Sequence, residues 1–248
     1  EELIPQFSLI RQACEAFNLP SIKMKGFEAD DLIATYATRA KDGQDEVTIV
    51  SSDKDLMQLV SNNVRMFDPM KNRIIEEEQV FEKFGVGPDR VIDVQALAGD
   101  STDNVPGVPG IGIKTAAELI NTYGDLETLL ARAGEIKQPK RRERLQEHSE
   151  DARMSKELVT LKSDVPVRDS IDDFTIQPLE AKKVLSFLRS QHFTSIEKRM
   201  ERELRGNTTP QQGNYTLIQD VETLKQWIEK AHKLGVVAVD TETTSLNA

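Results

Sequence analysis

The chain has 248 residues, of which 38% are hydrophobic and 30% charged, as is usual for a globular protein. Its 42 acidic and 32 basic residues give a net charge of −10, which by itself argues against a simple basic nucleic-acid binder. No stretch approaches the roughly 18 apolar residues that span a bilayer, no signal peptide is evident at the start, and the single cysteine, Cys14, excludes an intramolecular disulfide. We therefore expect a cytoplasmic protein without a membrane partner.

Strands and helices alternate over the first part of the chain, which predicts an α/β fold with a mainly parallel sheet and flanking helices. The apolar stripe of the first helix includes Cys14, which favours a buried structural thiol over a nucleophile. The expected elements are a helix over 3–18, a strand at Ile22–Met24, a helix over 28–41, a strand at Val47–Val50, a helix starting at Leu56, and a hairpin of 64–68 and 73–75.

Helical patterns dominate the middle of the chain, and a polar, turn-rich segment without apolar periodicity predicts a linker before a further domain. In that last part, strands at Tyr215–Ile218 and Val236–Val239 flank a helix over 221–233. The predicted parts are an α/β core over 1–76, a helical region over 77–204, a linker over 205–214, and the start of another domain over 215–248.

Three short acidic clusters border apolar segments, and the second directly follows the strand Val47–Val50, where ligand sites of open α/β sheets lie. Each cluster also has a plain structural explanation, because acids favour helix starts, cap helices and shape turns. The acids concerned are Glu28, Asp30 and Asp31, then Asp53 and Asp55, then Asp100 and Asp103.

If the fold gathers these acids, a cation must hold them together, because like charges about 4 Å apart repel by roughly 4 kcal/mol at an effective dielectric near 20. Oxygen ligands without nearby His or Cys favour Mg²⁺ or Mn²⁺. Two such ions about 3.5–4 Å apart are suited to in-line attack on a phosphodiester. The sequence thus predicts a metal-dependent phosphodiesterase.

A Pro/Gly-rich turn joins two predicted helices over about 93–121. It lacks both the Gly-Lys-[Ser/Thr] of a nucleotide-binding phosphate loop and the dinucleotide fingerprint, so no nucleotide cofactor is expected. Amides at the start of the second helix could bind a backbone phosphate without reading base identity; the alternative is a plain turn between packed helices. The residues expected at DNA are Gly107, Gly110, Gly112, Lys114 and Thr115.

A basic run follows this turn. Such runs are usually solvated surface, and here it could equally follow a DNA strand, so both interpretations stay open. The run consists of Lys137, Lys140, Arg141, Arg142 and Arg144.

Gly26–Asp31, Ser51–Asp55 and Gly99–Gly107 together resemble the acidic motifs of the 5′-nuclease (flap endonuclease-like) family, and Gly107–Lys114 resembles its helix–hairpin–helix. The resemblance implies an incomplete PIN-like core and a monomer that cleaves 5′ flaps and nicked or gapped DNA regardless of sequence. It also implies two or more bound divalent ions and a K⁺ ion at the hairpin. Glu28 and Asp30 would lean toward one metal ion, Asp31, Asp53, Asp55 and Asp100 toward the other, and Asp103 would lie at or next to the ligands.

The end of the chain, Val236–Leu246, resembles the opening Asp-x-Glu motif of a ribonuclease H-like 3′–5′ exonuclease domain, with Asp240 and Glu242 as its acids. A 5′-nuclease joined to such a domain resembles the bacterial DNA polymerase I family, which acts in replication and repair. The rest of that second site lies beyond Ala248, so Asp240 and Glu242 are not expected to function in this chain.

The family's first strand, a further Asp ligand and a basic helical arch are expected before Glu1. We therefore expect little nuclease activity from this chain and an uncovered sheet edge. The alternatives are a non-catalytic DNA-binding module, a stand-alone 5′-nuclease, and a carboxylate-metal phosphatase acting on small molecules.

Overall fold

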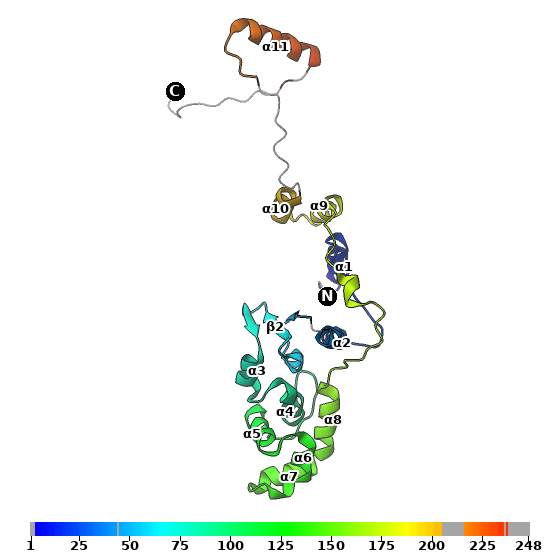
Figure 1. Ribbon diagram of the computed structural model, residues 1–248, viewed down its shortest axis with the longest axis vertical. Coiled ribbons are helices and arrows are strands. Elements are labelled where there is room, and N and C mark those ends of the chain that lie inside the picture. Colours follow the sequence, from blue (N-terminus) through cyan, green and yellow to red (C-terminus); the bar gives the residue numbers. More distant parts are fainter. Residues whose placement is uncertain (1–2, 44, 205–215, 236, 238–248) are drawn as a thin grey trace, which may run out of the picture. The chain divides into compact units, whose positions relative to one another are not determined.

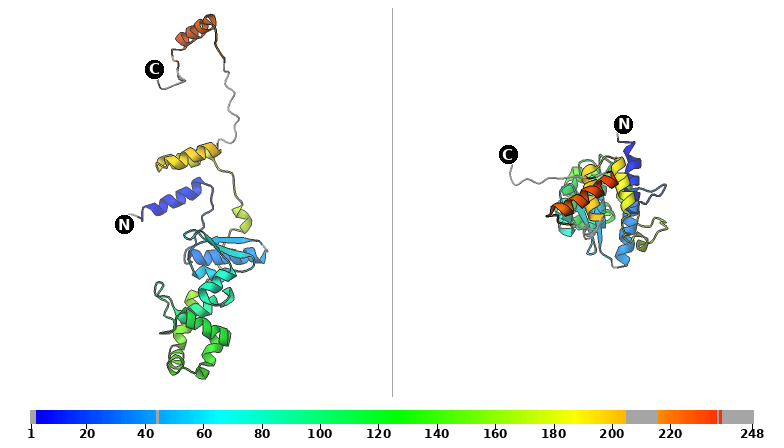
Figure 2. Two further views of the ribbon diagram at one scale, coloured as in Figure 1. Left: turned by 90° about the vertical axis from the view of Figure 1, so that its left-hand side faces the viewer. Right: turned by 90° about the horizontal axis from the view of Figure 1, so that it is seen from above.

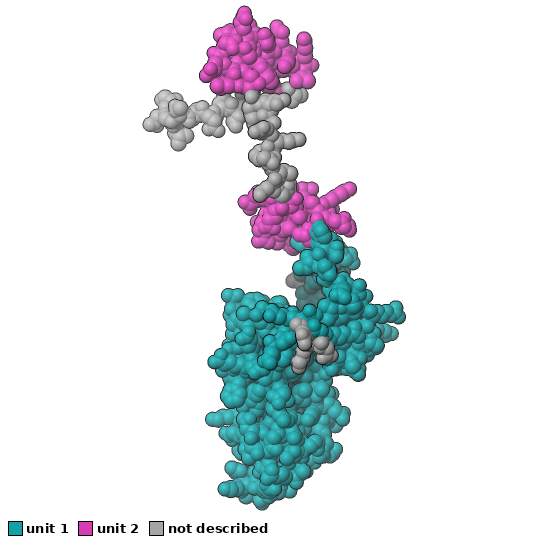
Figure 3. Space-filling model, in the orientation of Figure 1, with its two compact units in different colours: residues 1–178 teal, residues 179–248 magenta. Residues whose placement is uncertain are grey.

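The computed structural model describes residues 3–43, 45–204, 216–235 and 237. It divides into two compact units, Glu1–Pro178 and Leu179–Ala248, which Figure 3 shows in different colours. The predicted boundaries at 76/77 and 204/205 stay predictions.

A three-stranded sheet in the order β1-β2-β3 lies in the first unit. Its strands are β1 (Val47–Val50), β2 (Val64–Asp68) and β3 (Arg73–Ile75). β1 runs parallel to β2 with Val47 opposite Val64, whereas β2 and β3 form the predicted antiparallel hairpin. The expectation of a mainly parallel sheet is therefore right only for the β1–β2 pair of the described strands. β1 is an edge strand of the described sheet, and its Val50 is 65% exposed, so the sheet face on which Val50 lies is uncovered there.

Two helical elements place the first acids beside this sheet. α2 (Ala29–Asp42) confirms the predicted helix and buries Ala34, Ala37 and Ala40. The helix expected from Leu56 is the short 3₁₀ helix η1 (Asp55–Leu59), whose Leu56 and Met57 are buried. α2 contacts both β1 and η1, and in the left view of Figure 2 it lies beside the sheet.

Two predictions for the first residues need correction. The first helix is present as α1 (Gln6–Ala16), but its apolar stripe is not covered, since Phe7 and Ile10 are 52% and 57% exposed and Cys14 is only partly buried. Ile22–Met24 forms no strand. Ile22 and Met24 instead pack on a small second core around Leu32, Val165 and Val167, so side-chain burial, not strand pairing, explains their apolar character.

The rest of the first unit is helical, as expected, and is built around α4 (Val91–Ala98), whose Val91, Val94 and Leu97 are fully buried. In Figure 1, α4 lies between α5 (Ile113–Tyr123) and α8 (Ser149–Val159), and it contacts both. The other elements are α3 (Glu77–Phe84), η2 (Pro88–Arg90), α6 (Leu126–Ala131), η3 (Ala133–Glu135), α7 (Pro139–Glu147) and η4 (Ile171–Phe174).

In the second unit, α9 (Ala181–Ser190) packs against α10 (Thr194–Leu204), and Arg189 forms ion pairs with Glu197 and Glu201 at 2.6 and 2.7 Å. α11 (Val221–Leu234) confirms the predicted helix. Residues 216–218 form no strand, so the prediction for Tyr215–Ile218 is wrong for these three.

Several predictions fall on residues outside those described: the linker 205–214, Tyr215, most of Val236–Val239, and Asp240 and Glu242. The start of a ribonuclease H-like domain is therefore not shown. No helix in the described part of the chain is long and apolar enough to span a membrane.

Candidate metal centre and nucleic-acid interface

The first acidic cluster lies at the start of α2, with Asp30 and Asp31 in its first turn. The unpaired amides at a helix start favour carboxylates there. Asp31 is already held by backbone groups: its Oδ2 accepts from the amide of Glu28 at 3.2 Å and its Oδ1 from the amide of Lys162 at 2.9 Å. Asp31 therefore ties the helix start to the segment after α8, whereas Asp30 is influenced by the charges of nearby carboxylates.

The second cluster follows β1. Asp53 Oδ1 accepts from the amide of Asp55 at 3.0 Å, and Asp53's own amide donates to Ser51 Oγ at 3.1 Å, so Asp53 forms a local turn before η1, whose N-cap is Lys54 and lacks a side-chain cap. Asp55 accepts a hydrogen bond from Gln95 Nε2 of α4. Gln95 is only 5% exposed, and its Oε1 has no partner among the described residues. The amide thus fixes the orientation of the Asp55 carboxylate from the helical core.

The third cluster is joined to the second by a lysine. Lys54 Nζ donates to Asp100 Oδ2, and Asp100 Oδ1 accepts from the amide of Thr102 at 2.7 Å. These two donors hold the pKa of Asp100 below its usual range, and the Asp100 partner raises the pKa of Lys54, to which the charges of Asp55 and Asp103 add. Lys54 therefore sits as a cation among carboxylates of two clusters.

The three clusters interact electrostatically. Burial raises the pKa of Asp30, and the nearby charges of Asp53, Glu28 and Asp55 raise it further. Burial also raises the pKa of Asp55, against the opposing hydrogen bond from Gln95, and Asp53 and Asp103 add to the rise. Residues from α2, from the end of β1 and from the turn after α4 thus share one region of charge.

The carboxylates of the three clusters are near enough to interact electrostatically, but they do not converge on one point. Among the described residues, no three Asp, Glu, His or Cys side chains meet in an arrangement that holds a metal ion. What the structure does show is a set of carboxylates that repel one another, with Lys54 compensating part of their charge. Such a set of hard oxygen donors without imidazole or thiolate fits Mg²⁺ or Mn²⁺.

The helix–hairpin–helix consists of α4, the turn 99–112 and α5. Its glycines allow two chain segments to touch: Gly107 (φ +60°) lies so close to Gly99 that a Cβ there would be 2.4 Å from the Gly99 nitrogen. The Gly107 amide donates to the buried Ser155 Oγ of α8 at 2.9 Å. Gly107 is itself buried, so in this structure it packs the turn and does not expose an amide.

The start of α5 carries the other residues expected at DNA. Gly112 precedes the helix without a side-chain cap, so the amides of the first turn, including those of Lys114 and Thr115, are available to an anion. Lys114 and Gly110 are exposed. The arrangement suits a phosphate approaching along the axis of α5.

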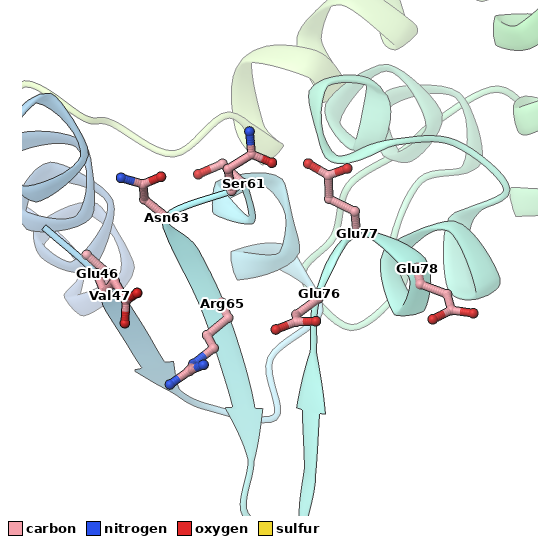
Figure 4. A pocket seen from close by; sticks show the side chains of 9 residues that line it. Glu46, Val47, Ser61, Asn63, Arg65, Glu76, Glu77 and Glu78 are labelled. Carbon is pink, nitrogen blue, oxygen red and sulfur yellow. The ribbon is translucent and has the colours of Figure 1, made fainter. Parts of the chain in front are cut away.

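A pocket elsewhere in the first unit lies away from these acids. It is formed where β1 and β2 begin and β3 ends, the end of β1 opposite to Asp53, and Figure 4 shows Glu46, Arg65 and Glu76–Glu78 around it. Chemistry based on the acidic clusters therefore does not take place in this pocket.

Three functional neighbours were missed from the sequence: Lys54, Gln95 and Ser155. Lys54 stands between two acids, and Gln95 is a polar residue within an apolar helix, Val91–Ala98, so both carried a signal. Ser155 carried no such signal, because nothing in the sequence of its own helix indicates that its hydroxyl accepts a hydrogen bond from the amide of Gly107.

Two family models match the chain. Residues 1–85 match the 5′-3′ exonuclease N-terminal resolvase-like domain, and residues 86–182 match the 5′-3′ exonuclease C-terminal SAM fold. Among solved structures, the bacteriophage T5 flap endonuclease in complex with DNA and metal ions aligns with a TM-score of 0.57 at 20% identity, covering 82% of this chain and 66% of that one. A T5 5′-exonuclease aligns with a TM-score of 0.54 at 21% identity, covering 74% and 69%. These two likenesses show the fold.

Curated relatives are closer in sequence. DNA polymerase I of Rhizobium leguminosarum is 42% identical over the whole of this chain, which spans 32% of that protein. A 5′-3′ exonuclease of Aquifex aeolicus is 34% identical over 81% of this chain, and 68% of it is covered. The chain thus spans about a third of the first relative and two thirds of the second. The two domain models and these relatives show that the chain belongs to the 5′-3′ exonuclease family.

Proposed function

We propose that this chain is the 5′-3′ exonuclease part of a bacterial DNA polymerase I and serves the hydrolysis of DNA phosphodiesters at 5′ flaps and at nicked or gapped duplexes. The observation that carries the proposal is the shared electrostatic region of Asp30, Asp55 and Asp100, whose acids come from three separate segments. A fold gathers repelling carboxylates at a cost in stability, and a bound cation offsets that cost.

Two or more Mg²⁺ or Mn²⁺ ions would be held by the carboxylates of the three clusters: Glu28, Asp30, Asp31, Asp53, Asp55, Asp100 and Asp103. When bound, such ions supply Lewis-acid stabilisation of the charge that develops on the phosphodiester. The chain's own groups orient the ligands. Gln95 fixes the orientation of Asp55. Lys54 holds Asp100 in place and reduces the net negative charge of the region.

The helix–hairpin–helix would hold the duplex through its backbone. Amides at the start of α5, with Lys114 beside them, would contact phosphates, and such contacts do not depend on base sequence. A K⁺ ion at carbonyl oxygens of the turn would add a further charge for the phosphate. No nucleotide cofactor is needed for this grip.

The relatives support two settings for this activity. The Rhizobium DNA polymerase I favours a part of a longer polymerase that acts in replication and repair in the bacterial cytoplasm. The Aquifex 5′-3′ exonuclease, of which 68% is covered, supports a stand-alone nuclease as the second candidate. In both settings the chain would act as a monomer.

The test measures metal binding and DNA binding separately. We expect Mn²⁺ titration by calorimetry to show binding to the chain, and a variant with Asp30, Asp55 and Asp100 all changed to Asn to lose it. The same variant should still bind fluorescent 5′-flap DNA, with Asp89→Asn on the exposed surface as the control for charge. A chain that binds no Mn²⁺, or a triple variant that binds it as well as the parent, would contradict the proposed metal role. Hydrolysis of the flap, followed in parallel, reports the turnover of the chain itself.

A further inference from the structure

An unpaired basic surface lies next to the hairpin turn. The chain carries a net charge of −10, and several cations of the helical region form ion pairs with carboxylates, as Arg132, Arg153 and Lys156 do. Five cations lie close together between 137 and 144, and none of the five has a carboxylate partner within 4.0 Å among the described residues. These are Lys137, Lys140, Arg141, Arg142 and Arg144.

Helix geometry separates these cations by role. Leu145 of α7 is fully buried and fixes the inner face of the helix, and Arg142 donates to the carbonyl of Ile136 at 3.3 Å. Lys140 and Arg144 are four residues apart, hence on one face, and both are exposed. α7 therefore presents at least two cations to solvent on the same side.

One of them is fixed onto the hairpin. Arg144 Nη1 donates to the carbonyl of Pro109 at 3.1 Å, although the two residues are 35 positions apart. The approach depends on Gly110, since a Cβ built at that glycine would lie 1.8 Å from Nη1. The guanidinium therefore rests on the turn that leads into α5, in space that a side chain at 110 would fill.

A guanidinium has five N–H donors, and the bond to Pro109 uses one of them. The remaining donors suit a phosphate, which Arg binds through two parallel hydrogen bonds. We propose that Arg144, assisted by Lys140, forms a phosphate-binding site beside the hairpin and extends the nucleic-acid grip of α5 onto α7. This proposal rests on the proposed function, because its ligand is the phosphate backbone of duplex DNA.

The experiment measures how DNA affinity depends on salt. The chain, in EDTA so that no hydrolysis occurs, is titrated onto fluorescent duplex DNA with a 5′ flap at several NaCl concentrations. Each phosphate contact contributes about 0.9 to the slope of log K against log salt for B-DNA. We expect Arg144→Gln to reduce the slope by about 0.9 and to weaken binding roughly five- to tenfold at about 0.1 M salt, while Arg144→Lys retains most of the slope.

Arg65→Gln is the matched control. Arg65 is exposed on β2 and donates to Thr48, so its variant removes the same charge at the sheet end of the unit. Thermal unfolding confirms that each variant is folded. A slope for Arg144→Gln equal to that of the parent, or an equal loss in Arg65→Gln, overturns the α7 site while leaving DNA binding intact. If the parent chain binds no DNA, both the proposed DNA binding by the helix–hairpin–helix and the α7 site are contradicted.

Discussion

Lys54 and Asp100 are 46 positions apart in the chain, and their side chains meet in an ion pair that joins the end of β1 to the turn after α4. The Asp100 side chain is only 10% exposed, so its charge is largely removed from water. With Asp55 and Asp103 acting on the same lysine, the pair lies in the middle of the acidic region. The ion pair joins the second and third acidic clusters of the candidate metal centre.

Lys54→Met should destabilise the chain when no divalent metal is present. The variant leaves Asp100 without its cation and increases the repulsion among the acids, which we expect to lower the free energy of unfolding by about 1 kcal/mol. Thermal unfolding in EDTA measures this. Added Mg²⁺ should recover more stability in Lys54→Met than in the parent, because an ion takes over the compensation that Lys54 gave. Equal Mg²⁺ responses would contradict the idea that lysine and metal stabilise the same acids.

Gln95→Leu should weaken metal binding without unfolding the protein. The amide orients Asp55, and loss of a group that orients a ligand typically lowers metal affinity about 10- to 100-fold. Because the substitution also removes a buried, unpartnered Oε1, stability should change little. Mn²⁺ calorimetry and thermal unfolding distinguish the two effects. Unchanged affinity for Mn²⁺ would show either that Asp55 keeps its orientation when Gln95 is replaced or that Asp55 does not bind the metal ion.

The sequence predicts those features of the site that depend on neighbouring residues, and it does not predict those that depend on contacts between residues far apart in the chain. Val47–Val50 was predicted as a strand because its residues are β-branched, and the acids after it were expected at a ligand site because strands end there. Ile22 and Met24 are also apolar, but they are partly buried against a small core that contains Val165 and Val167, residues more than a hundred positions away. The contacts Lys54–Asp100 and Gln95–Asp55 join residues 46 and 40 positions apart. Lys54 and Gln95 each carried a local signal, but no local pattern could have predicted which residue each would contact.

Ser155→Ala should destabilise the helix–hairpin–helix. The Ser155 hydroxyl is fully buried and accepts the amide of Gly107, so its loss leaves a buried N–H without a partner at a cost of about 1–3 kcal/mol. Chemical denaturation measures the change. Ser190→Ala, which removes a hydroxyl from an exposed residue of α9, is the control and should change stability by less than about 0.5 kcal/mol.

The start of α6 should make stability depend on pH in a defined window. The Thr128 amide and hydroxyl donate to Asp125 and hold the pKa of its carboxyl below the ordinary value of 3.8. A depressed folded-state pKa adds stability that is present above the unfolded-state pKa and is lost as pH falls through the folded-state value. Asp125→Asn keeps a cap but does not titrate. Its melting temperature should lie below that of the parent at pH 7, and the difference should close below about pH 4. A constant difference from pH 7 to pH 3 would mean that the Asp125 charge contributes nothing.

Asp30→Asn should make the metal-free chain more stable and less responsive to metal. Burial and the charges of Asp53 and Glu28 raise the pKa of Asp30, so at neutral pH its ionised form destabilises the folded state. Removing the charge should raise the free energy of unfolding in EDTA by up to about 1 kcal/mol. The parent should gain stability from Mg²⁺, because an ion that binds only the folded state shifts the unfolding equilibrium, and Asp30→Asn should gain less. Thermal unfolding with and without Mg²⁺ gives both values, and Asp89→Asn on the exposed surface should show neither change. If Asp30→Asn lowered stability in EDTA, the Asp30 carboxylate would stabilise the fold and would not be an acid retained at a cost to the fold.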